Sequence, residues 1–210
     1  MSAGTLSVRR TEAGLALLGI LALPPVAAWL EGHMLGHMLV QIPLLVVAGH
    51  LLGPAAARRW PRCLRGGNRG GIAGILLASF TLSFWMLPRS LDAALGEPLM
   101  EAAKFLSLPL LAGVPLALSW PRLHPVARGF VWANLISMLA VMGWLYLAAP
   151  VRLCNSYLVD QQTLLGWALL LLTALTTLAW AAGVFFGGTK MADNGAECRE
   201  HFRSPPVESS

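Results

Sequence analysis

The sequence predicts an all-α membrane protein, a polytopic bundle of transmembrane helices with about six spans. Of its 210 residues, 56% are hydrophobic and only 12% are charged, whereas a water-soluble domain carries roughly a quarter charged residues. The apolar residues also come in runs close to the ~20 residues that cross a bilayer as a helix. The ~10-residue alternating segments of a membrane β-barrel are absent.

Six apolar runs are separated by polar or Pro- and Gly-rich joints. They cover residues 13–30, 34–53, 71–88, 98–119, 127–149 and 162–187. Together they form one transmembrane domain, 1–188, and the polar segment 189–210 is expected to be a disordered cytoplasmic tail. The first run follows Arg9 and Arg10 and ends in PVAAW, so it also resembles a cleavable signal peptide, whose removal would leave five spans.

Basic residues orient the spans, because Lys and Arg favour the cytoplasmic ends of membrane helices. With the N-terminus inside, twelve of the 15 Lys and Arg residues fall on the cytoplasmic side and only Arg89, Lys104 and Arg152 on the other. Both termini are therefore predicted to be cytoplasmic. The same rule explains the basic loop 58–69, so nucleic acid is not an expected partner. The excess of Arg over Lys, with abundant Ala and Gly, favours the inner membrane of a GC-rich bacterium.

The segment HMLGHM at 33–38 opens the second span at its predicted outer end. Residues four apart lie on one face of an α-helix, so His33, His37 and Gln41 are expected to form one stripe, and Met34 and Met38 a second. Two imidazoles at this spacing can hold one metal ion. Thioethers beside them favour copper, and Cu(I) in particular. Histidines at a membrane interface and methionines in a span are also common without any metal, as solvated or packing side chains.

Other soft or polar side chains are expected at the same depth, because neighbouring spans begin or end there. Three of them could complete a low-coordinate Cu(I) site: Met86, Met100 and Cys154. Asp92 and Asp160 add negative charge that attracts cations. Asp92 could equally pair with Arg89, three residues away, and Asp160 could simply cap the last helix.

Motifs of known enzyme classes are absent from the sequence. It has no Walker P-loop, no GxSxG, no haem-attachment CxxCH and no dinucleotide-binding fingerprint. A function other than catalysis is therefore predicted. The middle of the spans holds almost no charge, with Asn134 the main polar group, so neither an ion relay nor a solute path is expected.

Three segments together are similar to the CtaG family of multi-span cytochrome c oxidase assembly proteins. They are HMLGHML at the start of one span, FWMLPRSLDAAL at the end of the next, and DQQTLLGWALLL at the start of the last. The resemblance covers residues 29–185. It implies a respiratory-chain assembly factor that handles Cu(I) for a haem-copper oxidase subunit, with a periplasmic copper chaperone as a further partner. The functional residues it implies are His33, Met34, His37, Met38, Asp92, Asp160 and Gln161.

The chain departs from the family pattern in two respects. It is shorter, with six predicted spans where seven are common in the family, and it lacks a pair of histidines. The family bears a further histidine pair at the start of the span that here reads LMEAAKFL, and the corresponding residues are Met100 and Lys104. A protonated lysine cannot bind a metal ion. The alternative function is therefore a metal-free membrane scaffold or accessory subunit that contacts oxidase helices through faces rich in small residues.

Overall fold

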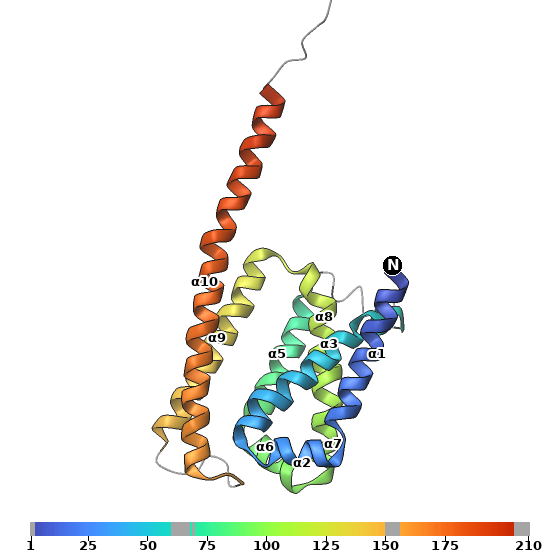
Figure 1. The fold of residues 1–210 in the computed structure, drawn as a ribbon, viewed down its shortest axis with the longest axis vertical. Helices are drawn as coiled ribbons and strands as arrows, with labels where there is room; N and C mark the ends of the chain where they lie inside the picture. The colour runs from blue at the N-terminus through green and yellow to red at the C-terminus, as the bar shows by residue number, and fades with distance from the viewer. Residues whose placement is uncertain (1–2, 60–67, 69, 150–155, 204–210) are drawn as a thin grey trace, which may run out of the picture.

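The computed structural model describes residues 3–59, 68, 70–149 and 156–203, and within them it shows helices and connecting segments but no strand (Figure 1). The prediction of an all-α fold is confirmed. In chain order the elements are α1 (Ala3–Leu21), α2 (Pro24–Glu31), η1 (Gly36–Gln41), α3 (Ile42–Arg59), α5 (Ile72–Met86), α6 (Pro88–Gly96), α7 (Pro98–Ser107), η2 (Leu108–Gly113), α8 (Val114–Ser119), η3 (Trp120–Arg122), α9 (Pro125–Ala148) and α10 (Val159–Arg203).

Several of these helices are long and apolar enough to cross a membrane. Among the described residues four such stretches occur: Gly36–Arg59, Pro98–Arg122, Pro125–Ala148 and Val159–Phe185. Two more arise if each of two bent helix pairs counts as one span: Thr5–Leu21 with Pro24–Glu31, bent by 69°, and Ile72–Met86 with Pro88–Gly96, bent by 70°. The described part of the chain thus has four to six candidate spans. Each of the six predicted runs falls on one of these helices or pairs.

Both bends come directly before a proline. Leu23 precedes Pro24 and Leu87 precedes Pro88, and both leucines have extended backbone angles, with ψ of 127° and 129°. Proline pushes the residue before it out of the helical region, so the helix breaks there and restarts in a new direction. As a result α2 and α6 both lie at the lower end of the molecule in Figure 1, where α7 begins.

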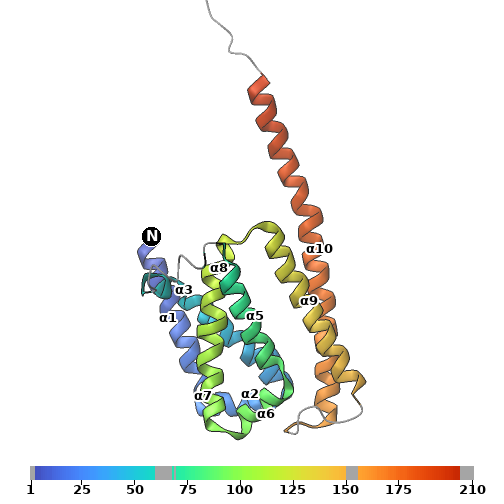
Figure 2. The ribbon, with the colours of Figure 1, turned by 180° about the vertical axis from the view of Figure 1, so that it is seen from behind.

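Most of the helices form one group, and a helical pair lies beside it (Figures 1 and 2). Within the group α1 lies along α3, and the continuous column of α7, η2 and α8 contacts both α3 and α5. The pair consists of α9 and α10, which pack along each other. The start of α1 and the far end of α10 lie toward the same end of the molecule, as an even number of spans requires. Which end faces the cytoplasm stays a prediction.

Two stretches of π-helix widen the spans just before a proline. Pro43 and Pro115 each lack an N–H, and their rings would collide with the carbonyl four residues earlier in a regular α-helix. In both places the residue before the proline instead donates its N–H to the carbonyl five residues earlier, Ile42 to His37 and Val114 to Pro109. Such π-helical turns are frequent at functional sites. The first of them contains His37 and Gln41.

The last helix is longer than the sequence predicts. Its membrane-compatible part ends at Phe185, close to the predicted limit of residue 187. The helix itself continues to Arg203, into the segment 189–210 for which disorder is predicted. No proline interrupts the chain before Pro205, so the backbone can continue as a helix beyond the apolar run.

Candidate functional site

A buried lysine of α7 lies among polar side chains from the end of α2 and from η1. The Lys104 side chain has no exposed area, and its Nζ forms an ion pair with Glu31 Oε1 at 2.6 Å. The same ammonium lies 3.2 Å from His37 Nε2 and donates to Gln41 Oε1 at 3.3 Å. A lysine ammonium has three protons, and three acceptors surround it here. We call these four residues, Glu31, His37, Gln41 and Lys104, the Lys104 cage.

The cage is tied to the chain before α10 through His37. Because lysine can only donate, His37 Nε2 must accept from Lys104, which leaves the ring proton on Nδ1. His37 Nδ1 lies 3.0 Å from the Tyr157 hydroxyl, and that hydroxyl donates to the backbone carbonyl of Glu31 at 2.7 Å. Gln41 Nε2 closes the network by donating to Glu31 Oε1 at 2.9 Å. Each polar atom of the His37 ring therefore has a partner.

Four separate parts of the chain supply this network. Glu31 is the last residue of α2, so the proline bend before α2 carries its carboxylate toward the interior. His37 and Gln41 lie in the π-helical η1 and are fully buried, and Lys104 lies in α7. Burying charges is unfavourable unless they are paired and hydrogen-bonded, and this network supplies both requirements. The cage thus fastens α2, η1 and α7 to one another.

The predicted histidine stripe is only partly present. His37 and Gln41 both face the cage, whereas the His33 side chain is exposed and its Nδ1 lies 3.5 Å from the Trp29 carbonyl of its own turn. The chain turns and bends at Gly32 and His33, and helix resumes only at Met34. The four-residue spacing therefore does not place His33 on the helical face of His37.

The predicted methionine ligands lie in the apolar core. Met34 and Met38 are buried, and Met86 and Met100 pack against the same hydrophobic cluster. The Tyr146 hydroxyl donates a hydrogen bond to Met38 Sδ at 3.5 Å. Cys154, the remaining predicted ligand, lies outside the described residues.

Two of the three acidic and amide residues implied by the resemblance accept hydrogen bonds from distant parts of the chain. Asp92 Oδ1 accepts from the Ser156 N–H at 3.4 Å. Asp160 is exposed in the first turn of α10, where a carboxylate interacts favourably with the helix dipole. Gln161 Oε1 accepts from the Met34 N–H at 3.2 Å and so joins the start of α10 to the start of the second span.

Sequence reasoning missed two members of the network, Glu31 and Tyr157. In the sequence Glu31 is one of several negative charges at the predicted outer surface, and Lys104 is one of three positive charges there. A signal was available: an acid and a base flank two different apolar runs at the same predicted depth, and ionisable groups at that depth are expected to pair.

The donors near Lys104 do not fit a metal ion in this arrangement. Both nitrogens of His37 are engaged, His33 is exposed, and the space among the donors already holds a positive charge. In the described part of the chain no group of three or more His, Cys, Asp or Glu side chains is close enough to hold an ion. A carboxylate, an imidazole and an amide oxygen here surround an ammonium instead.

No family model matches the chain, and no curated protein or solved structure matches it. The resemblance to the CtaG family therefore stays a prediction from three sequence segments. The Lys104 cage is the feature of the described residues that bears most directly on whether a metal ion can bind beside His37.

Replacing Tyr157 with phenylalanine should loosen the cage without removing a charge. The change deletes the hydroxyl that joins His37 Nδ1 to the Glu31 carbonyl, and a hydrogen bond of this kind contributes about 1 kcal/mol. We expect the free energy of unfolding in detergent to fall by about 1–2 kcal/mol. Thr163→Val, which removes an exposed hydroxyl bonded only to its own helix, is the matched control. Equal stability of Tyr157→Phe and wild type would contradict the assigned network.

Proposed function

We propose that this chain is a metal-free membrane scaffold that assists the assembly of a haem-copper oxidase in the bacterial inner membrane. The candidate spans support the membrane location, and the three family-like segments support the oxidase as partner. The observation that carries the metal-free part is the Lys104 ammonium held by Glu31, His37 and Gln41. A fixed positive charge repels a metal cation from the same donors.

The scaffold role also agrees with what surrounds the cage. The cage and Tyr157 connect three helical elements and the segment before α10, so this end of the protein is held in one arrangement. Large apolar side chains are exposed on the connected helices, with Trp29 of α2 at 71% and Leu99 of α7 at 80%. Tryptophan is among the residues that contribute most of the binding energy at protein contacts, so Trp29 is the candidate anchor of such a contact.

The proposal is tested by restoring oxidase assembly in a host strain that lacks this chain. The double variant His33→Ala/His37→Gln removes both imidazoles, while the glutamine oxygen still offers Lys104 an acceptor. Because the scaffold needs no metal ligand, we expect this variant to restore the haem absorbance and the oxygen consumption of the membranes to the wild-type level. An immunoblot controls for equal amounts of protein.

Two outcomes would contradict it. If the variant is present in the membrane but the oxidase lacks activity until the histidines are returned, the imidazoles act as ligands and the metal-free role is wrong. If the wild-type chain itself makes no difference to the oxidase, the assembly role is wrong.

A second candidate function is Cu(I) handling by thioethers, which the grouping of methionines favours. Met34 and Met38 are both buried in the cluster against which Met86 and Met100 pack, and thioethers select Cu(I). Under this function, purified protein competes with a Cu(I) chelator and Met34→Leu/Met38→Leu does not. Equal competition by both proteins would remove this candidate.

A further inference from the structure

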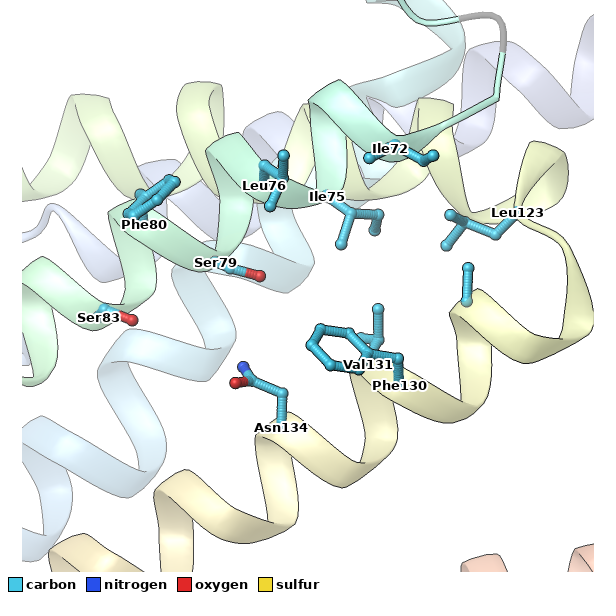
Figure 3. A pocket seen from close by; sticks show the side chains of 11 residues that line it. Ile72, Ile75, Leu76, Ser79, Phe80, Ser83, Leu123, Phe130, Val131 and Asn134 are labelled. Atoms are coloured by element: carbon cyan, nitrogen blue, oxygen red, sulfur yellow. The ribbon is translucent and has the colours of Figure 1, made fainter.

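An apolar groove lies between α5 and α9 (Figure 3). It has a volume of about 320 Å³, and its walls are mostly large hydrophobic side chains such as Phe80 and Phe130. Three polar side chains also line it, Ser79 and Ser83 of α5 and Asn134 of α9. In Figure 3 the Asn134 carboxamide points across the groove toward α5.

The groove exists because α9 stands away from α5 over most of its length. Within α9 the buried residues are Gly143 and Tyr146, both in its last two turns. On the side that faces the groove, the earlier turns of α9 are not covered by another helix of the described chain. Phe130, in one of these turns, is 72% exposed. The helix that packs along α9 is α10. Within the described part of the chain, no other helix occupies the groove between α9 and α5.

The polar side chains of the groove lack hydrogen-bond partners in the described part of the chain. The threonines of α10 behave differently, since Thr163, Thr173 and Thr176 each bond a carbonyl of their own helix. Asn134 is the tenth residue of a 24-residue candidate span, about 14 Å from its start. That depth is in the hydrocarbon region of the bilayer, where no water is available to form hydrogen bonds with the Asn134 amide.

We propose that this groove binds a transmembrane helix of another membrane protein, one that carries a hydrogen-bonding side chain at mid-membrane depth. Such a side chain satisfies Asn134, and a helix of small residues fits between the phenylalanines. A lipid acyl chain is the other apolar group that can occupy the groove, but it neither donates nor accepts a hydrogen bond and so leaves Asn134 unpaired. A second copy meeting through the same face would set one concave surface against another, which is not self-complementary.

The inference goes beyond the oxidase proposal, because the groove lies on different helices from the Lys104 cage and recognises a side chain in the membrane. The partner is defined by its chemistry, a transmembrane helix with a hydrogen-bonding side chain at mid-membrane depth, and it need not belong to an oxidase. The inference therefore survives if the oxidase role fails.

Photo-crosslinking in intact native membranes tests the inference with the full-length chain. A benzophenone amino acid replaces Phe80 or Phe130 in the groove, or Phe185 outside it. These positions are matched in exposure, at 72%, 72% and 77%. We expect both groove positions to give one discrete protein adduct that Phe185 does not give. Mass spectrometry of the adduct should place the crosslink in an apolar segment that contains Asn, Gln, Ser or Thr.

Substitution of Asn134 makes the test specific. Asn134 is exposed, so Asn134→Leu should fold as wild type, and it should reduce the adduct by about three- to thirtyfold, the range expected for one interhelical hydrogen bond in a membrane. Asn134→Gln, which keeps an amide, should retain the adduct. The inference is overturned if the groove positions label only lipid, if the adduct is a second copy of this chain, if Phe185 gives the same adduct, or if Asn134→Leu leaves its yield unchanged.

Discussion

Replacing Lys104 with methionine should lower the free energy of unfolding by about 3–5 kcal/mol, the cost expected when one partner of a buried ion pair is removed. The Glu31 side chain is only 13% exposed, so its carboxylate would lose its cation without gaining water. Gln41 and His37 would lose a donor at the same time. The measurement is unfolding of the purified variant in detergent, by heat or by a denaturing detergent.

A double-mutant cycle distinguishes this pairing from a general effect of the substitution. Glu31→Gln/Lys104→Met removes both charges, so we expect it to be more stable than Lys104→Met alone. Glu97→Gln, which neutralises an exposed carboxylate, serves as the control and should change stability little. Strict additivity of the Glu31 and Lys104 substitutions would show that the two side chains do not interact.

Replacing Gly49 with alanine should destabilise the bundle by about 1–3 kcal/mol or more, because α3 and η2 touch at that residue. A Cβ on Gly49 would come under 3.0 Å from the backbone of Pro109, and a Cβ on Gly113 would meet the backbone of α3 equally closely. Backbone atoms cannot move aside as a flexible side chain can. The columns must then separate, and buried contacts on both sides are lost.

Gly129→Ala is the matched control, because a Cβ there meets nothing within 4 Å. Alanine is the better helix former, so we expect this variant to be as stable as wild type or up to about 1 kcal/mol more stable. The same unfolding assay compares the two variants. A Gly49→Ala protein as stable as Gly129→Ala would mean that α3 and η2 do not pack this closely.

The helices themselves could be predicted from sequence because a membrane span is specified locally. A run of ~20 apolar residues is sufficient to define one, and each predicted run coincides with a helix or a bent pair. Bends and π-helical turns were harder to predict. Pro24, Pro43, Pro88 and Pro115 all stand at such places, but proline alone does not say whether a helix breaks or widens.

The candidate site could be predicted only in part, because its contacts join residues far apart in the chain. Helical periodicity correctly put His37 and Gln41 on one face, and it failed for His33, which precedes the first helical turn. The pairing of Glu31 with Lys104 spans 73 positions and depends on how the end of α2 is placed beside α7. Charges at a common depth indicate that some pair forms, but which residues form it depends on the packing between helices, which helical periodicity does not give.

We propose that Lys104 takes the place of a metal ion among Glu31, His37 and Gln41. The most direct test is the copper content per chain of protein purified after loading with Cu(I) under reducing conditions, with wild type beside His33→Ala/His37→Ala. We expect the two proteins to hold the same amount of copper, with no stoichiometric ion that depends on the histidines. One copper ion per wild-type chain, lost in the double variant, would contradict it.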